Sequence, residues 1–201
     1  MAMATANLDA WDRASEDRTK VESKTVRQSV LEFYGIKSKT YCQIAGARTR
    51  NVVNAHIWPK GSKANLVLLD LQPTDIDNPK NILRLHKSLE RFFDHKQFTF
   101  EESGHGRYIL KVLDRGILAE ALEDSPLKVS DMEGRNLKFH NDSRPWRRIL
   151  ALHSIMAHRH ARSQGWLVDA DLTSAESNAQ ALINHSLDQE AQERLKLFLR
   201  D

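Results

Sequence analysis

The hydrophobic pattern predicts helices toward both ends of the chain. From about Leu8 to Tyr34, apolar residues recur at helical spacing among charged ones, as one helix or as two with a break near Asp17. A second helical pattern covers residues 145–164, and a third covers roughly 174–199. A glycine directly follows each of the first two patterns, as it does at many helix ends.

The middle of the chain has the pattern of short strands joined by turns. Residues 52–57 are rich in residues that favour strands, and Pro59 ends that run. Residues 97–100 and 108–113 predict a β-hairpin, because two apolar runs flank a turn that contains glycine. Residues 65–70 fit a buried strand or a short helix equally well.

The segment 41–100 places such elements in a particular order. A strand carries the string A-H-I-W-P around His56, a turn-rich stretch leads to Asn81, and an amphipathic helix ending in F-D covers about 87–94. A ββα metal finger needs a strand that presents a base, a turn held by an asparagine and a helix that offers a metal ligand. The segment resembles the HNH endonuclease family, in the subgroup with an A-H-I-x-P string and a finger helix that ends in F-D.

The resemblance implies catalytic roles for two residues. His56 would be the general base that deprotonates the attacking water, a task for which histidine is suited because it exchanges protons near neutral pH. Asn81 would hydrogen-bond across the loop and hold that base in place without touching the metal. Without the resemblance, His56 is interpreted as a core histidine beside Ile57 and Trp58, and Asn81 as a turn or capping residue.

The predicted finger helix departs from the family pattern at Glu90, where the subgroup usually carries a ligand histidine. Glu90 and Asp94 are four residues apart and therefore share one helix face, where two carboxylates would suit Mg²⁺ or Mn²⁺ rather than zinc. His86, one turn before Glu90, is the third candidate metal ligand. Asp94 has a second interpretation, as a brace for the turn after the helix.

Three basic residues of the same segment are candidates for stabilising the transition state. They are Arg84, Lys87 and Arg91. The departure at Glu90 leaves two outcomes open, a nuclease with an altered metal preference or a scaffold that has lost its activity.

Composition excludes several classes of protein. The single cysteine, Cys42, excludes an internal disulfide and a cysteine-rich zinc site. No apolar run is long enough to span a membrane and no secretory signal is visible, so we expect an intracellular protein without a membrane partner. The net charge of +3 indicates a polyanionic partner only if the basic residues cluster.

Basic residues do cluster in the helical pattern near residue 150. At about 100° per residue, five arginines fall within one arc of roughly 120°. They are Arg144, Arg147, Arg148, Arg159 and Arg162, and the next acid is Asp169. Beside a nuclease-like finger, this favours a surface that tracks phosphates over a solvated face, with DNA favoured over RNA as the partner.

These observations predict an α+β fold in which a ββα-metal finger with an added β-hairpin is flanked by N- and C-terminal helices. The expected parts are an N-terminal helical segment 1–40, a core 41–115 and a C-terminal extension 116–201, packed as one compact unit. The resemblance implies a metal-dependent nucleic-acid endonuclease. The alternative is a catalytically decayed HNH scaffold that acts as a nucleic-acid-binding or interaction module.

Overall fold

The computed structural model describes residues 23–104, 106–167 and 169–200, which contain both helices and short strands. In chain order the elements are α2 (Lys24–Phe33), β1 (Tyr41–Cys42), β2 (Ala47–Arg48), β3 (Val52–His56), β4 (Ile82–His86), α3 (Lys87–Asp94), β5 (Phe98–Glu102), β6 (Tyr108–Val112), α4 (Arg147–Ser163), α5 (Asp169–Ser186) and α6 (Gln189–Arg200). The described strands form three separate antiparallel pairs. The fold is therefore α+β, as the sequence predicts.

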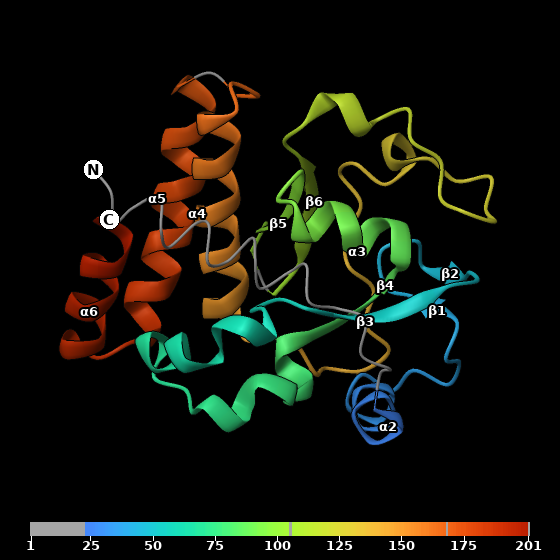
Figure 1. Ribbon diagram of the computed structural model, residues 1–201, viewed down its shortest axis with the longest axis horizontal. Coiled ribbons are helices and arrows are strands. Elements are labelled where there is room, and N and C mark those ends of the chain that lie inside the picture. Colours follow the sequence, from blue (N-terminus) through green and yellow to red (C-terminus); the bar gives the residue numbers. More distant parts are fainter. Residues whose placement is uncertain (1–22, 105, 168, 201) are drawn as a thin grey trace.

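The predicted ββα finger is present as β3, β4 and α3. The two strands pair antiparallel, with His56 opposite Ile82 and Val52 opposite His86. The connection between them contains the 3-10 segments η1 (Lys60–Leu69), η2 (Pro73–Asp77) and η3 (Pro79–Asn81). The helix α3 begins directly after β4 and packs on both strands (Figure 1).

The two faces of the β3–β4 hairpin have different neighbours. Because side chains alternate along a strand, Asn54 and His56 share one face, while Ala55 lies on the other. Ala55 and Leu83 are fully buried in the main hydrophobic core together with Leu89 of α3. The opposite face meets α2, because Ile82 belongs to a smaller core with residues of that helix.

The predicted second hairpin is β5–β6, and the C-terminal helices pack on it. The helix α4 contacts both β5 and α5, and Figure 1 shows α4 and α5 side by side at one end of the molecule. The main hydrophobic core extends from Cys42 in β1 to Leu195 in α6. The finger and the C-terminal helices therefore share one core.

Two predictions of secondary structure need correction or completion. The pattern over 174–199 is two helices rather than one, because α5 ends at Ser186 and α6 begins at Gln189. The carboxylate of Asp188 accepts a hydrogen bond from the backbone N–H of Ala191 at 2.8 Å at the start of α6. Residues 65–69 lie in the 3-10 segment η1 and not in a strand. The predicted N-terminal helix is described only from Lys24, and the part of that prediction before residue 23 lies outside the described residues.

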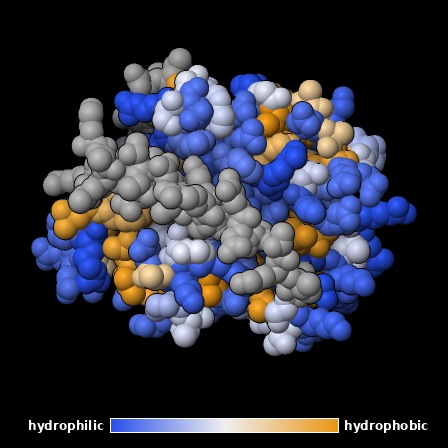
Figure 2. All heavy atoms as spheres, in the orientation of Figure 1, coloured by the Kyte–Doolittle hydropathy of each residue, from blue (hydrophilic) through white to orange (hydrophobic). Residues whose placement is uncertain are grey.

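The described surface has little exposed hydrophobic area. Figure 2 shows hydrophobic residues as small separate groups among hydrophilic ones. Among the described residues, the large hydrophobic side chains that are exposed are Val67 and Leu197. No helix in the described ranges has the length and apolar character needed to cross a bilayer.

Candidate functional site

The side chain of His56 lies at the end of β3, in contact with an aspartate from the following loop. Its Nε2 atom is 3.0 Å from Oδ1 of Asp77, and Nζ of Lys60 is 2.8 Å from the same oxygen. The His56 side chain is 11% exposed, whereas the Asp77 side chain is 40% exposed. The site is therefore a partly buried imidazole that is tied to a carboxylate at the surface.

The charge of Asp77 determines how the His56 ring is held. The hydrogen bond from His56 holds the pKa of the Asp77 carboxyl well below its usual range, with partial burial acting against this and Lys60 adding to it. The carboxylate stays ionised around neutral pH, and an ionised carboxylate only accepts hydrogen bonds. A neutral His56 ring therefore carries its proton on Nε2, which makes Nδ1 the basic nitrogen.

The side chain of Asn81 spans the loop that separates His56 from Asp77. Its Oδ1 accepts a hydrogen bond from the backbone N–H of Trp58 at 2.8 Å. Its Nδ2 donates to the carbonyl oxygens of Trp58 at 3.1 Å and of Ile76 at 2.9 Å. Because Trp58 lies two residues after His56 and Ile76 directly precedes Asp77, this fully buried amide holds both ends of the His56–Asp77 contact. The catalytic role of Asn81 stays a prediction.

His86 occupies a different position from the one that the sequence suggested. It is the last residue of β4 and the N-cap of α3, so it is not one turn before Glu90 on the same helix. Its Nδ1 accepts from the backbone N–H of Ser88 at 3.1 Å, and its Nε2 lies 3.0 Å from the carbonyl oxygen of Glu123. Burial lowers the pKa of the His86 ring, which favours this neutral, capping arrangement.

The two carboxylates predicted to bind metal are both on α3. Glu90 is partly exposed in the first turn, and Asp94 is 8% exposed at the last residue of the helix. Within residues 23–104, 106–167 and 169–200, no three histidine, cysteine or acidic side chains converge as a metal-ligand group. The donors thus do not fit a closed zinc cage. Two carboxylates on one helix are the donor type that Mg²⁺ or Mn²⁺ takes together with water and phosphate oxygens, and their role as ligands stays a prediction.

The buried Arg84 is unsuited to the role of stabilising a transition state. Its guanidinium is fully buried on the Asn54 face of the finger and donates to Oδ1 of Asn54 at 2.7 Å and to the carbonyl oxygen of Val52 at 3.2 Å. Lys87 and Arg91, the other two candidates, are exposed on α3.

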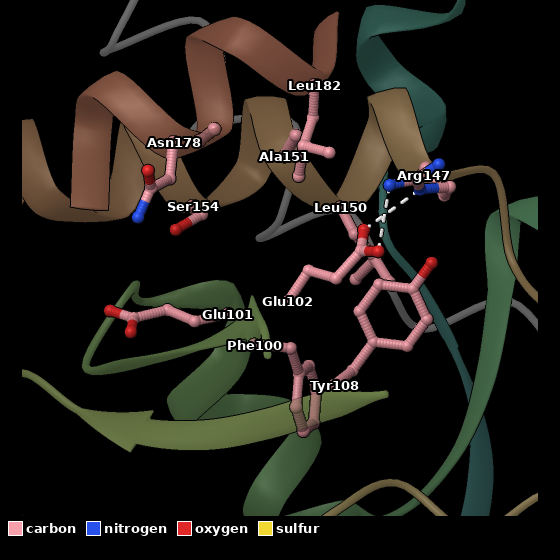
Figure 3. A pocket seen from close by; sticks show the side chains of 11 residues that line it. Phe100, Glu101, Glu102, Tyr108, Arg147, Leu150, Ala151, Ser154, Asn178 and Leu182 are labelled. Carbon is pink, nitrogen blue, oxygen red and sulfur yellow. Dashed lines mark hydrogen bonds and ion pairs between the residues drawn. The ribbon is translucent and has the colours of Figure 1, made fainter. Parts of the chain in front are cut away.

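The five arginines around α4 do not form one continuous face, which corrects the prediction of an arginine stripe. Ile155 and His158 lie within the same arc and are buried. Arg147 forms two hydrogen bonds with Glu102, at 2.8 and 2.9 Å, in a pocket beneath α4 and α5 (Figure 3). Arg148 donates to the carbonyl oxygen of Asp70 at 3.3 Å, and burial lowers the pKa of its guanidinium.

The remaining three arginines have different surroundings. Arg144 precedes α4, donates to the carbonyl oxygen of Asn141 at 2.6 Å and lies over the Phe139 ring. Arg159 donates to the carbonyl oxygen of Leu199, and Arg162 is exposed in the last turn. Their contribution to nucleic-acid binding stays a prediction.

Sequence reasoning missed Asp77 and Lys60 as neighbours of His56. Asp77 is 21 residues from His56, and its only sequence signal is its place in the turn-rich stretch before Asn81. Helical or strand periodicity cannot pair residues across a loop of this length, so the contact follows only from the folded loop.

Comparison with known proteins gives a match that coincides with this region. Residues 42–101 match a family model described as HNH endonuclease. No curated protein and no solved structure matches the chain. The matched range contains β3, β4 and α3 with His56, Asp77, Asn81 and Glu90. Over residues 42–101, the finger of this chain is thus similar to the HNH endonuclease family.

Proposed function

We propose that this chain is an HNH-type endonuclease that hydrolyses phosphodiester bonds in nucleic acid, with His56 as general base. The observation that carries the proposal is the contact of 3.0 Å between His56 and Asp77, formed within the segment that matches the family model. The match to the HNH family model supports a nuclease-type function in general. The named residues and their roles are our proposal.

The proposed step assigns one task to each side chain of the dyad. Nδ1 of His56 takes a proton from water while the water oxygen forms a bond to phosphorus, and the bond from phosphorus to the leaving sugar oxygen breaks. Asp77 holds the ring through Nε2 and stabilises the imidazolium that forms. Asn81 acts indirectly, because its hydrogen bonds to Trp58 and Ile76 hold the loop on which the contact depends.

We propose Glu90 and Asp94 as the residues that would hold Mg²⁺ or Mn²⁺. When bound, such an ion neutralises charge that develops on the phosphate oxygens. Glu90 is the more accessible of the two, since Asp94 is 8% exposed. His86 is not part of the proposed set, because Ser88 and Glu123 already engage its ring nitrogens.

Two observations favour a second function. Glu90 replaces the usual ligand histidine, and no three metal-ligating side chains converge within the residues that the structure describes. This favours the alternative, a decayed HNH scaffold that binds nucleic acid or another partner without cutting it.

The two functions are separated by a cleavage assay. The purified protein is incubated with supercoiled plasmid DNA, and in parallel with single-stranded DNA and RNA, in Mg²⁺, Mn²⁺ or EDTA. The proposed function predicts cleavage that requires the metal and is lost in His56→Ala, with DNA as the better substrate. Binding without cleavage in every metal would favour the decayed scaffold instead.

A further inference from the structure

The chain that leads into the finger and forms its first strand has an unusual distribution of charge. Between Glu32 and Asp70 the chain contains no acidic residue, although at 27 acids in 201 residues about five would be expected in a stretch of that length. This acid-free segment, residues 33–69, contains β1, β2 and β3. It carries six basic residues, Lys37, Lys39, Arg48, Arg50, Lys60 and Lys63, and all six are exposed.

The charges of this segment are mostly available to a partner. Lys60 is paired with Asp77 at 2.8 Å. The side chains of the other five form no hydrogen bond or ion pair with the described part of the chain. The arginines of α4 differ, because Arg147 and Arg159 are used in contacts with Glu102, Leu199 and Glu176.

The fold brings this basic segment to the strand that carries His56. The backbone N–H of Thr49 donates to the carbonyl oxygen of Thr40 at 2.8 Å, so Lys39 and Arg50 directly flank the end of the β1–β2 ladder. The buried guanidinium of Arg84 donates both to the carbonyl oxygen of Lys39 and to Oδ1 of Asn54, two residues before His56.

The basic segment also continues past His56. Lys60 and Lys63 begin the 3-10 segment η1, and Lys60 reaches the same Asp77 oxygen as His56. Next to Arg50, one acid adjoins the basic residues, since Asp124 accepts a hydrogen bond from Asn51 at 3.3 Å. Basic side chains therefore precede and follow the proposed base along the same stretch of chain.

We infer that the acid-free segment is the surface on which the finger binds the phosphodiester backbone of its nucleic acid, in place of the predicted α4 stripe. This inference rests on the proposed function. Lysine and arginine contacts to phosphates position a nucleic acid without reading its sequence, and each one contributes to the salt dependence of binding. The surface therefore fits a polyanionic backbone of any sequence.

A pair of matched variants tests this surface. The first carries Lys37→Gln, Lys39→Gln, Arg48→Gln and Arg50→Gln, and leaves Lys60 unchanged because it touches Asp77. The control carries Arg107→Gln, Lys111→Gln, Lys128→Gln and Arg135→Gln, which removes the same charge from exposed positions outside the segment. Binding of labelled duplex and single-stranded DNA is measured by fluorescence anisotropy against salt concentration.

The inference predicts that the slope of log K against log salt becomes shallower by about 0.7–0.9 for each phosphate contact removed, or about 2–4 units in the first variant. The slope of the control should equal that of the wild type. Equal slopes in the two variants would overturn the inference, whether or not the protein cuts DNA. If the wild type bound no nucleic acid at all, the inference and the proposed function would both fail.

Two double variants, Lys37→Gln with Lys39→Gln and Arg48→Gln with Arg50→Gln, protect the test against loss of folding. Each is expected to unfold at the wild-type temperature. Each should also show up to about half of the change in salt slope expected for the fourfold variant. A wild-type slope in both double variants would contradict the inference as clearly as a wild-type slope in the fourfold variant.

Discussion

The ionised state of Asp77 is the property on which the proposed chemistry of His56 depends. A carboxylate at Nε2 keeps the proton on that nitrogen and stabilises the ring when it becomes charged. Lys60 shares the same carboxylate oxygen, which limits how far Asp77 can move.

Asp77→Asn tests this dependence with almost no change in side-chain size. The amide can donate to Nε2, which would favour the other tautomer, so we expect the single-turnover cleavage rate to fall roughly a hundredfold or more. Nucleic-acid affinity should be nearly unchanged, because Asp77 carries no proposed substrate contact. Lys60→Gln is the matched control at the same oxygen, and a similar loss in both variants would contradict a specific role for Asp77.

Glu90→His restores the residue that the subgroup usually carries at this helix position. If Glu90 holds the ion, the variant should still cut, with its metal preference shifted from Mg²⁺ or Mn²⁺ toward Zn²⁺ or Ni²⁺, because imidazole prefers softer ions. Cleavage rates across these four ions provide the measurement. An identical metal profile in the wild type and the variant would mean that Glu90 is not a ligand.

At the scale of elements, one side chain joins the two ends of the loop between β3 and β4. Asn81 makes three buried hydrogen bonds, two of them to Trp58 and one to Ile76. Core residues such as Leu66 and Leu69 also hold this loop. The Asn81 bonds hold the backbone next to His56 and Asp77, so their loss would loosen the contact between those two side chains.

Asn81→Ala should therefore destabilise the protein and slow cleavage together. Leaving buried backbone groups of Trp58 and Ile76 without partners is expected to cost about 2–4 kcal/mol in the free energy of unfolding, measured by urea denaturation. The control is Asn78→Ala, which removes a capping hydrogen bond from the backbone N–H of Lys80 at 3.0 Å and a long one to Asp75 at 3.5 Å, and should cost about 1 kcal/mol or less. Equal losses in the two variants would contradict the role of Asn81 as the main anchor.

A second element-scale contact joins α4 to β5 through His158. Its Nε2 lies 3.1 Å from a carboxylate oxygen of Glu101, and its Nδ1 lies 2.8 Å from the carbonyl oxygen of Ser154. Burial opposes the charged ring, but the two acceptors outweigh it and raise the pKa of His158. Both ring nitrogens face acceptors, so the protonated ring fits this position.

The pH dependence of stability follows from this raised pKa. A histidine with a higher pKa in the folded state contributes stability that is fully present below the pKa of the unfolded chain, about 6.5, and is lost as the pH rises through the folded value. We expect the difference in melting temperature between the wild type and Glu101→Gln to be largest near pH 6 and to decline toward pH 8. A difference that grew with pH would contradict this assignment.

At the scale of the whole molecule, predictions from local patterns succeeded, and those that depend on contacts between distant residues did not. The finger and the β5–β6 hairpin were predictable because periodicity, glycine turns and the F-D helix end are local signals. The contacts of Arg147 with Glu102 and of His56 with Asp77 join residues 45 and 21 positions apart, so no local pattern reports them. The prediction of a continuous arginine face on α4 was wrong for the same reason. The packing of α4 between β5 and α5 depends on distant parts of the chain and buries residues within the predicted arc.

The main hydrophobic core places the proposed chemistry at one side of the molecule. The hydrophobic cluster that includes Ala55 and Leu83 continues into the C-terminal helices, so the finger is supported from the α3 side. His56 lies on the other side of β3 from Ala55, because it pairs with Ile82, which packs with residues of α2. The boundaries at residues 40 and 115 stay a prediction.

The most direct measurement is the single-turnover cleavage of labelled DNA by wild-type protein and by His56→Ala, with DNA affinity measured on the same samples. We expect the wild type to cut in Mg²⁺ or Mn²⁺, while His56→Ala binds with nearly wild-type affinity and loses cleavage by a factor of about 10²–10⁴. Cleavage by His56→Ala at the wild-type rate would contradict the proposed mechanism, because His56 would then be a structural residue and the base would lie elsewhere.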